Sequence, residues 1–414
     1  MDPDEHLFRR ESGRLIAALT RIFGVHNLAL AEDVVQDAFC RAIEVWKLRG
    51  VPDNPGAWLM ATAKHRALDV VRRERTARTF APEVARLLGS EWTTATIVEE
   101  AFEAPAIRDE QLRMMFSCCD PRLAQDAQVA LVLNILCGFG AVEIAAAFLS
   151  GRAAIEKRIS RGKKTLATST RLFDLSDQQF TPRLSAVRRA LYLLFNEGYH
   201  GASADAPVRA ELCTEAMRLT RLLLEHPPAA VPETYALAAL MHLHAARLPA
   251  RIDAAGDLSA LADQDRARWD RGLVARGREL LERSAAGREV TTYHVEAAIA
   301  AEHASAPSVA DTNWAVVVEL YDRLFALAPS PVVALNRAIA IAERDGPERG
   351  LQALGAIADR ERLAAYPFYP AALGELELRR GGTDAARAHF AAALRLARSA
   401  PERRHLQKRL RACG

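Results

Sequence analysis

The chain has 414 residues and a formal net charge of +3, with 50% apolar and 26% charged side chains. This composition is typical of a folded globular protein, and it excludes disorder over most of the length. The length predicts two or three domains. The longest uncharged stretch, residues 127–142, contains polar residues and glycines and is too short to cross a membrane, and the acidic start MDPDEH is unlike an export signal.

The chain has six cysteines, and no two of them are spaced as a CxxC pair. In a chain of this length, such cysteines are typical of reduced, mostly buried thiols. We therefore expect a cytoplasmic protein with no metal site and no other cofactor.

Nearly every apolar period along the chain has helical spacing, so the sequence predicts an all-α protein. The first expected helix spans residues 7–24 and ends at Gly24. The second spans residues 30–48. Its buried stripe is expected to consist of small or branched apolar residues: Ala31, Val34, Val35, Ala38, Ala42 and Val45.

Polar residues of the second helix lie opposite this stripe: Asp33, Gln36, Asp37, Arg41 and Glu44. A row of this kind is usually a solvated helix face. It becomes a docking surface only if another part of the sequence indicates a partner.

A third helix is expected to begin at Pro55, with Asn54 as its N-cap, and to end near Arg75. Up to Arg78, this segment has six Lys or Arg against two acids. Aromatic and polar residues beside arginines suit unstacked single-stranded bases. The helical spacing of Trp58 favours the core over a base platform for this side chain.

Residues 139–166 have the spacing of a helix-turn-helix, with a tight turn at Ser150-Gly151 and a second helix from Arg152. The inward positions of this second helix are apolar: Ile155, Ile159 and Leu166. Residues 150–171 carry seven Lys or Arg against one acid. Two basic segments in a nearly neutral chain indicate a polyanionic partner, and a pair of solvated helix faces is the alternative.

After residue 176 the pattern stays helical and contains a weak repeat. Gly346 and Gly382 lie 36 residues apart, each between two helical patterns. The second copy resembles the skeleton of the tetratricopeptide repeat at Leu373, Gly374, Ala386, Phe390 and Ala393. The first copy matches it more loosely, at Ala338, Gly350, Leu354 and Ile357. A generic helical bundle is the alternative.

An enzyme is the main rival class of function. Glu197 and His200, in the segment 195–200, are candidate ligands or acid–base groups, and so is the pair His242 and His244. Residues two apart on a helix face different ways, so the histidine pair is a poor metal site. We expect residues 195–200 to form a helix-terminating loop with satisfied polar groups, and we expect no catalytic residues.

Three segments, in this order, resemble regions two and four of bacterial sigma factors of the extracytoplasmic-function (ECF) type: AEDVVQDAFCRAIEVW, NPGAWLMATAKHRALDVVRRER and EIAAAFLSGRAAIEKRISRGKKTL. The C-terminal part resembles the extension of a subgroup of that family, with tetratricopeptide-like helices. The resemblance implies region two at residues 1–78, a linker at 79–107, region four with its helix-turn-helix at 108–172, and a regulatory helical extension at 177–414.

The resemblance also implies partners: core RNA polymerase and promoter DNA, with no membrane and no enzymatic activity. Docking on the clamp helices of the β′ subunit, with the β subunit as a further contact, is implied for Asp33, Gln36, Asp37, Phe39 and Arg41. Reading of the minus-ten element is implied for Asn54, Lys64, His65, Arg66, Arg72 and Arg73. Reading of the minus-thirty-five element is implied for Arg152, Lys157, Arg158, Arg161 and Lys164.

Some positions depart from the family pattern. His65 stands where many members have Asn, and Leu149 replaces the usual turn glycine, with Gly151 two positions later. Glu156 adds a negative charge to the reading helix, where it could pair with Arg152 or select cytosine.

The expected function is that of a sigma factor directing promoter-specific transcription initiation. Our hypothesis for the extension is that it binds a protein or peptide and regulates activity in place of a separate membrane anti-sigma factor. The alternative function is a tetratricopeptide-containing helix-turn-helix regulator that acts without replacing the sigma subunit. That alternative leaves residues 30–76 without a role.

Overall fold

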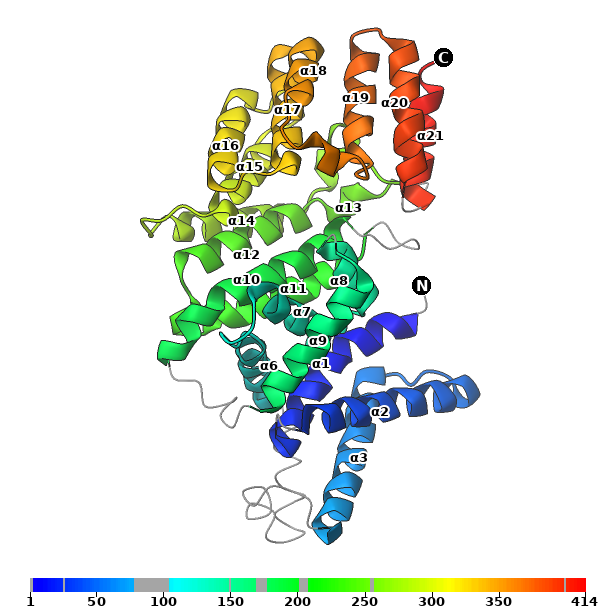
Figure 1. Ribbon diagram of the computed structural model, residues 1–414, viewed down its shortest axis with the longest axis vertical. Coiled ribbons are helices and arrows are strands. Elements are labelled where there is room, and N and C mark those ends of the chain that lie inside the picture. Colours follow the sequence, from blue (N-terminus) through cyan, green and yellow to red (C-terminus); the bar gives the residue numbers. More distant parts are fainter. Residues whose placement is uncertain are drawn as a thin grey trace. The chain divides into compact units, whose positions relative to one another are not determined.

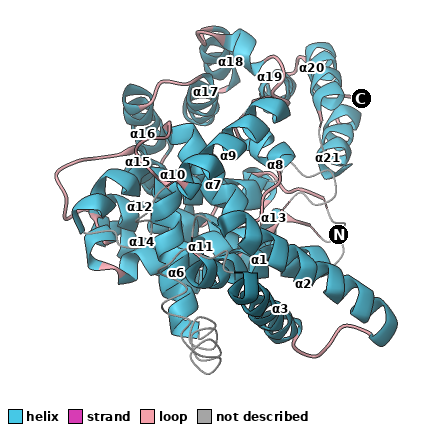
Figure 2. Cartoon of the chain, turned by 60° about the horizontal axis from the view of Figure 1, so that its bottom comes forward, coloured by secondary structure: helices cyan, strands magenta, loops and turns pink. Residues whose placement is uncertain are grey.

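The computed structural model describes residues 3–24, 27–77, 104–148, 150–168, 177–200, 208–253, 257–397 and 400–414. In this part of the chain the regular elements are helices, and Figure 2 shows no strand. Ile252 and Leu258 form an isolated antiparallel bridge. The all-α prediction is therefore confirmed. The chain divides into two compact units, unit 1 (Met1–Leu194) and unit 2 (Phe195–Gly414).

Unit 1 contains these helices: α1 (Pro3–Phe23), α2 (Leu28–Arg49), α3 (Pro55–Ala77), α6 (Ala104–Cys118), α7 (Gln125–Ile135), α8 (Ala141–Ala147) and α9 (Arg152–Ala167) (Figure 1). Helix α10 (Asp177–His200) begins in unit 1 and ends in unit 2. Most of the linker expected at residues 79–107 lies outside the described residues. Its last four residues belong to α6, which begins at Ala104.

The first three helices form where the sequence predicts them. Helix α1 ends before Gly24, whose φ of 79° suits glycine, and α2 buries its stripe of Leu28, Ala31, Val34, Val35, Ala38, Ala42 and Trp46. Val45 is only half-buried. The side chain of Asn54 caps α3, because its Oδ1 accepts a hydrogen bond from the backbone N–H of Ala57 at 3.0 Å. The predicted cap is therefore confirmed.

Helices α7, α8 and α9 pack closely against one another. Helix α9 buries the predicted residues Ile155, Ile159 and Leu166, and α8 buries Ile144 and Ala145. The packing requires Gly162 on α9, since a Cβ there would lie 2.7 Å from the side chain of Leu131 on α7. Leu149 lies outside the described residues.

Helix α1 connects the N-terminal helices to α7 and α8. A Cβ on Gly13 would lie 2.1 Å from the carbonyl oxygen of Leu136, so only glycine permits this approach. Arg9 pairs with Glu143 at 2.7 Å. The segments that the sequence assigns to regions two and four therefore pack together within unit 1.

Unit 2 consists of helices in succession: α11 (Ala210–Glu225), α12 (Pro232–Ala245), α13 (Leu248–Arg251), α14 (Arg271–Ser284), α15 (Thr292–Ser305), α16 (Trp314–Leu327), α17 (Pro331–Asp345), α18 (Pro347–Gly355), α19 (Phe368–Arg379), α20 (Thr383–Leu396) and α21 (Ala400–Arg411). Short 3-10 helices connect some of them, at Pro227–Ala229, Leu261–Asp263, Arg266–Arg268 and Arg360–Leu363. Neighbouring helices from α14 to α21 pack in chain order (Figure 1).

Residues 195–200 differ from the expected loop, because α10 stays helical through His200. A Cβ on Gly198 would lie 2.8 Å from the backbone of Arg209, so this glycine permits close packing and does not end the helix. The buried carboxylate of Glu197 pairs with Arg209. The expectation of a loop was wrong, whereas the expectation of a satisfied Glu197 is confirmed.

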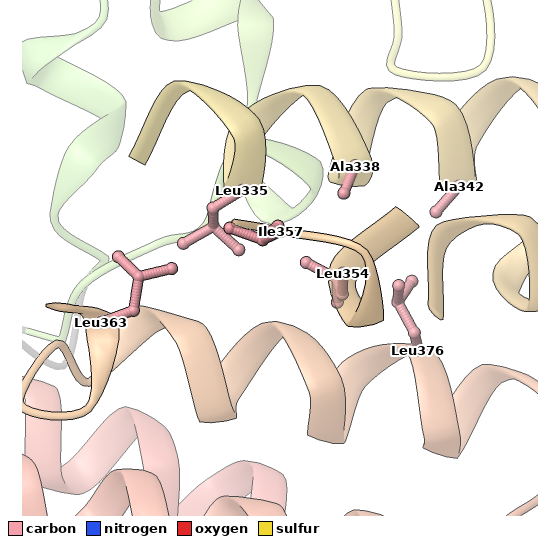
Figure 3. Close-up of a cluster of buried hydrophobic side chains, with 7 residues drawn as sticks. All are labelled: Leu335, Ala338, Ala342, Leu354, Ile357, Leu363 and Leu376. Carbon is pink, nitrogen blue, oxygen red and sulfur yellow. The ribbon is translucent and has the colours of Figure 1, made fainter. Parts of the chain in front are cut away.

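Three residues of the predicted first repeat copy, Ala338, Leu354 and Ile357, belong to one continuous buried cluster (Figure 3). It joins α17, α18 and α19 through Leu335, Ala338, Ala342, Leu354, Ile357, Leu363 and Leu376. Gly350 allows α18 to approach α17, since a Cβ there would lie 2.4 Å from Cβ of Ala342. In the second copy, Gly374 lies against the ring of Phe390, and Ala386, Phe390 and Ala393 are buried. Small residues therefore set the helix spacing in both copies.

None of the described helices is both long and apolar enough to span a bilayer. The six cysteines are free thiols, and all except Cys40 are buried. Burial raises the pKa of the Cys213 thiol to about 12, with a further contribution from Glu211. The prediction of mostly buried, unpaired cysteines is therefore confirmed.

Candidate nucleic-acid interface

Helix α9 presents an exposed basic face. Lys157, Arg161 and Lys164 are exposed, and Arg158 is half-buried. Among the described residues, none of these four forms an ion pair with an acidic side chain. The apolar residues Ile155, Ile159 and Leu166 hold the opposite side against α7 and α8, so the cations stay directed away from the core. Such a face attracts a polyanion.

Two acidic residues limit the charge of this helix. Arg152 pairs with Glu156 at 2.7 Å, with both side chains exposed, so Glu156 forms the (i, i+4) contact considered above. Lys163, on the side toward α2, pairs with Glu32 at 2.6 Å. The free basic face thus consists of the cations at 157, 158, 161 and 164.

The candidate residues of α3 are placed less uniformly. His65, Arg66 and Arg73 are exposed, and Lys64 is half-buried. Of the Arg72 side chain nothing is described. Trp58 is half-buried and packs edge-on against Trp46, with ring centroids 5.5 Å apart. Trp58 therefore belongs partly to the core, and part of it stays accessible beside the basic residues.

The polar face of α2 is exposed at Asp33, Gln36, Asp37 and Arg41. Phe39 is half-buried and stacks on Phe8, with ring centroids 4.8 Å apart. The outer surface of the same helix also exposes large apolar side chains, with Ile43 at 55% and Leu48 at 86%. Exposed apolar groups beside charges are typical of a surface that binds another protein.

One contact joins the α2 and α3 candidates. Arg66 donates a hydrogen bond to Oδ2 of Asp37 at 2.6 Å, although the two residues lie 29 positions apart. The candidate polymerase-docking face and the candidate minus-ten face therefore meet at this pair. The α9 candidates make no contact of this kind with either face among the described residues.

The N-terminal segment that carries these two faces matches the sigma-70 region 2 family over residues 7–77. The chain is also similar to the ECF RNA polymerase sigma factor SigX of Bacillus subtilis, with 23% identity over 138 residues that span 33% of this chain and 68% of SigX. The region 2 match and the similarity to SigX support an ECF-type sigma factor with a C-terminal extension.

This sigma factor carries a C-terminal extension. Residues 183–285 match a family of unknown function, DUF6596. An uncharacterized protein of Rhizobium meliloti (strain 1021) is 38% identical over 396 residues, which span 95% of this chain and 92% of the relative. The sigma factor and this relative therefore belong to one family over nearly their whole length, extension included.

Sigma factors bind core RNA polymerase and promoter DNA in transcription initiation and are not enzymes. The region 2 match covers residues 30–76, which the alternative regulator leaves without a role. Among the described residues, no group of three or more His, Cys, Asp or Glu is placed to hold a metal ion. Local patterns did not reveal the Asp37–Arg66 and Lys163–Glu32 contacts, because each joins residues distant in the chain.

Proposed function

We propose that this sigma factor binds a promoter at its minus-thirty-five and minus-ten elements while α2 docks on core RNA polymerase. The observation that carries the proposal is the basic face of α9, exposed and without acidic partners, in a chain whose N-terminal part matches sigma-70 region 2. Nonspecific charge attraction would bring the protein to DNA, and base contacts would select the promoter.

Helix α9 would read the minus-thirty-five element as the second helix of a helix-turn-helix. Helix α8 ends at Ala147 and α9 begins at Arg152, and α7 supports α9 from behind through Gly162. With the helix in the major groove, Arg161 and Lys157 would reach guanine edges or phosphates. Glu156, paired with Arg152, would orient that arginine at the start of the helix.

Helix α3 would bind unstacked bases of the minus-ten element. His65 and Arg73 are exposed on it, and Arg66 is held in place by Asp37. Asn54 would act by fixing the start of α3, since its Oδ1 already serves as the cap. Binding of flipped bases would offset an unstacking cost of a few kcal/mol.

The outer face of α2 would dock on the clamp helices of the β′ subunit. Its acidic residues Asp33 and Asp37 suit a basic partner surface, and the exposed Leu48 and Ile43 supply apolar area. Because Asp37 also holds Arg66, docking and minus-ten reading would be coupled through one ion pair.

The extension would regulate this activity in the cytoplasm as a tetratricopeptide-like array that binds a protein or peptide. The support is the succession of closely packed helices from α14 to α21, in which glycines at 350 and 374 set the spacing. A chain that ends at His200 would differ from the full chain in promoter output. Unchanged output and unchanged polymerase affinity would contradict this part of the proposal.

Promoter binding at several salt concentrations tests the role of α9. We expect Arg161→Ala and Lys157→Ala each to reduce the salt slope of binding by about one, because each removes a phosphate-neutralising charge. Arg395→Ala is the matched control, since Arg395 is exposed on α20 and its loss removes the same charge. Equal slopes for the two α9 variants and the wild type would refute the assignment.

A further inference from the structure

Unit 2 buries an arginine without an acidic partner. Arg247 follows α12, is 9% exposed, and donates one hydrogen bond, from Nε to Oε1 of Gln264 at 3.3 Å. Arginine has five N–H donors, and those on the two terminal nitrogens of Arg247 have no acceptor among the described residues. A largely buried cation without an acidic partner favours the binding of an anion, and the two terminal nitrogens of Arg247 are not among the fully buried unpaired atoms, so they keep some contact with solvent.

Aromatic rings flank this guanidinium without neutralising it. The Arg247 guanidinium carbon lies 5.4 Å from the ring centroid of Trp269 and 5.9 Å from that of Tyr199. Both rings also carry a buried polar atom with no partner among the described residues, Nε1 of Trp269 and the hydroxyl of Tyr199. The two rings that flank this cation thus carry two further unsatisfied donors.

Two further nitrogen-bearing side chains, Arg251 and His244, lie near the Tyr199 ring. Neither of them is acidic, so neither neutralises Arg247. Arg251 lies 4.4 Å from the ring of Tyr199 and donates to its carbonyl oxygen. His244 lies 5.0 Å from the Tyr199 ring, measured between centroids, and its Nδ1 is buried without a partner. Burial, with Arg247 and Arg251 nearby, holds the pKa of His244 well below its ordinary value, so its imidazole is neutral.

Arg266, which also lies near Trp269, differs from Arg247 because its terminal nitrogen has acceptors. It lies over the ring of Trp269, and its Nη1 donates to the carbonyl oxygens of His303 and Ala306 at the end of α15. These carbonyls satisfy Arg266, as is usual for a cation at a helix C-terminus. Arg247 has no such acceptor for its terminal nitrogens, so helix capping does not explain it.

We propose that Arg247, Tyr199 and Trp269 form a binding site in unit 2 for the carboxylate or phosphate group of a small molecule. The planar fork of Arg247 matches either group through two parallel hydrogen bonds, and the Tyr199 hydroxyl and Trp269 Nε1 add donors. The flanking rings would contact the apolar part of the ligand. This site concerns unit 2 alone and does not depend on the promoter-binding proposal.

Thermal unfolding of the full chain tests the site with two separate probes, inorganic phosphate and benzoate. Each is titrated at constant ionic strength against sodium chloride. We expect at least one of them to raise the unfolding temperature in a saturable way, at concentrations of about 1 to 10 mM. The probe that does so identifies the group that the site prefers. If neither raises the unfolding temperature above the chloride control, the proposal is wrong.

Variants separate this site from a general salt effect. Arg247→Met should raise the probe concentration needed for half of the shift in unfolding temperature at least about tenfold. Tyr199→Phe, which keeps the ring, should raise it roughly threefold to tenfold. Arg268→Gln is the matched control, because Arg268 is exposed nearby and should leave the response unchanged. If Arg247→Met does not fold, the unfolding response of Tyr199→Phe alone tests the proposal. A full response in the variants that fold would overturn the proposal.

Discussion

Glu197 and Arg209 form an ion pair at 2.5 Å in the interior of unit 2, between the end of α10 and the start of α11. Their side chains are 9% and 5% exposed. The backbones meet at the same place, since the N–H of Arg209 donates to the carbonyl oxygen of Gly198 at 2.7 Å. The pair therefore fixes how α11 begins against α10.

We expect Arg209→Ala to lower the free energy of unfolding by about 3–5 kcal/mol, because it leaves the carboxylate of Glu197 buried without its main partner. Urea unfolding followed by circular dichroism measures this change. Arg323→Ala removes an exposed pair with Glu319 and should cost less than about 1 kcal/mol. Equal losses of unfolding free energy in the two variants would show that the buried pair contributes no more to stability than the exposed pair.

Two glycines of α18 test how closely this helix packs against α17. Gly350→Ala places a methyl group 2.4 Å from Cβ of Ala342 and 2.8 Å from Leu376, and should destabilise by about 1–3 kcal/mol. Gly355→Ala on the same helix meets nothing within 4 Å and should be neutral or stabilising by up to about 1 kcal/mol. Unfolding midpoints of the two variants compare them directly. If Gly350→Ala leaves the unfolding midpoint unchanged, this result would contradict the close approach of α17 and α18.

The stability of unit 2 should fall in mild acid because of His303. Burial, with Arg247 and Arg266 nearby, lowers the pKa of His303 to about 4, while an unfolded histidine titrates near 6.5. Between these values the unfolded chain binds a proton that the folded chain does not. The contribution is therefore fully present above about pH 6.5 and is lost as the pH falls toward about 4.

The free energy of unfolding at several pH values measures this effect. His303→Gln should reduce the pH slope in this window by about 1.4 kcal/mol per pH unit. His65→Gln, which changes an exposed residue of α3, should leave the slope as it is. An unchanged slope in His303→Gln would mean that His303 is protonated in the folded protein at these pH values.

Local patterns predicted the helices and much of the candidate interface. The apolar period of residues 30–48 gave the buried stripe of α2, and Asn54 before Pro55 marked the start of α3. The basic face of α9 followed from the same reasoning, since inward Ile155 and Ile159 leave the cations outside. Periodicity works here because each helix buries one face against its neighbours.

Contacts between distant residues could not be predicted in this way. Lys163 and Glu32 are 131 residues apart, and no local pattern marks their pairing. Gly198 resembled a helix end, but the structure uses it for the approach of α11. The sequence around Arg247 does not indicate a binding site. The proposed site depends on the rings and unpaired donors that the fold brings around this residue.

Run-off transcription with core RNA polymerase and the full chain tests the central claim most directly. The template is promoter DNA selected from random sequence by the reconstituted holoenzyme. We expect a defined transcript only when the chain is added, and a much weaker one with Arg161→Ala or with Asp33→Lys on the proposed docking face of α2. The same products from core polymerase alone would contradict the account.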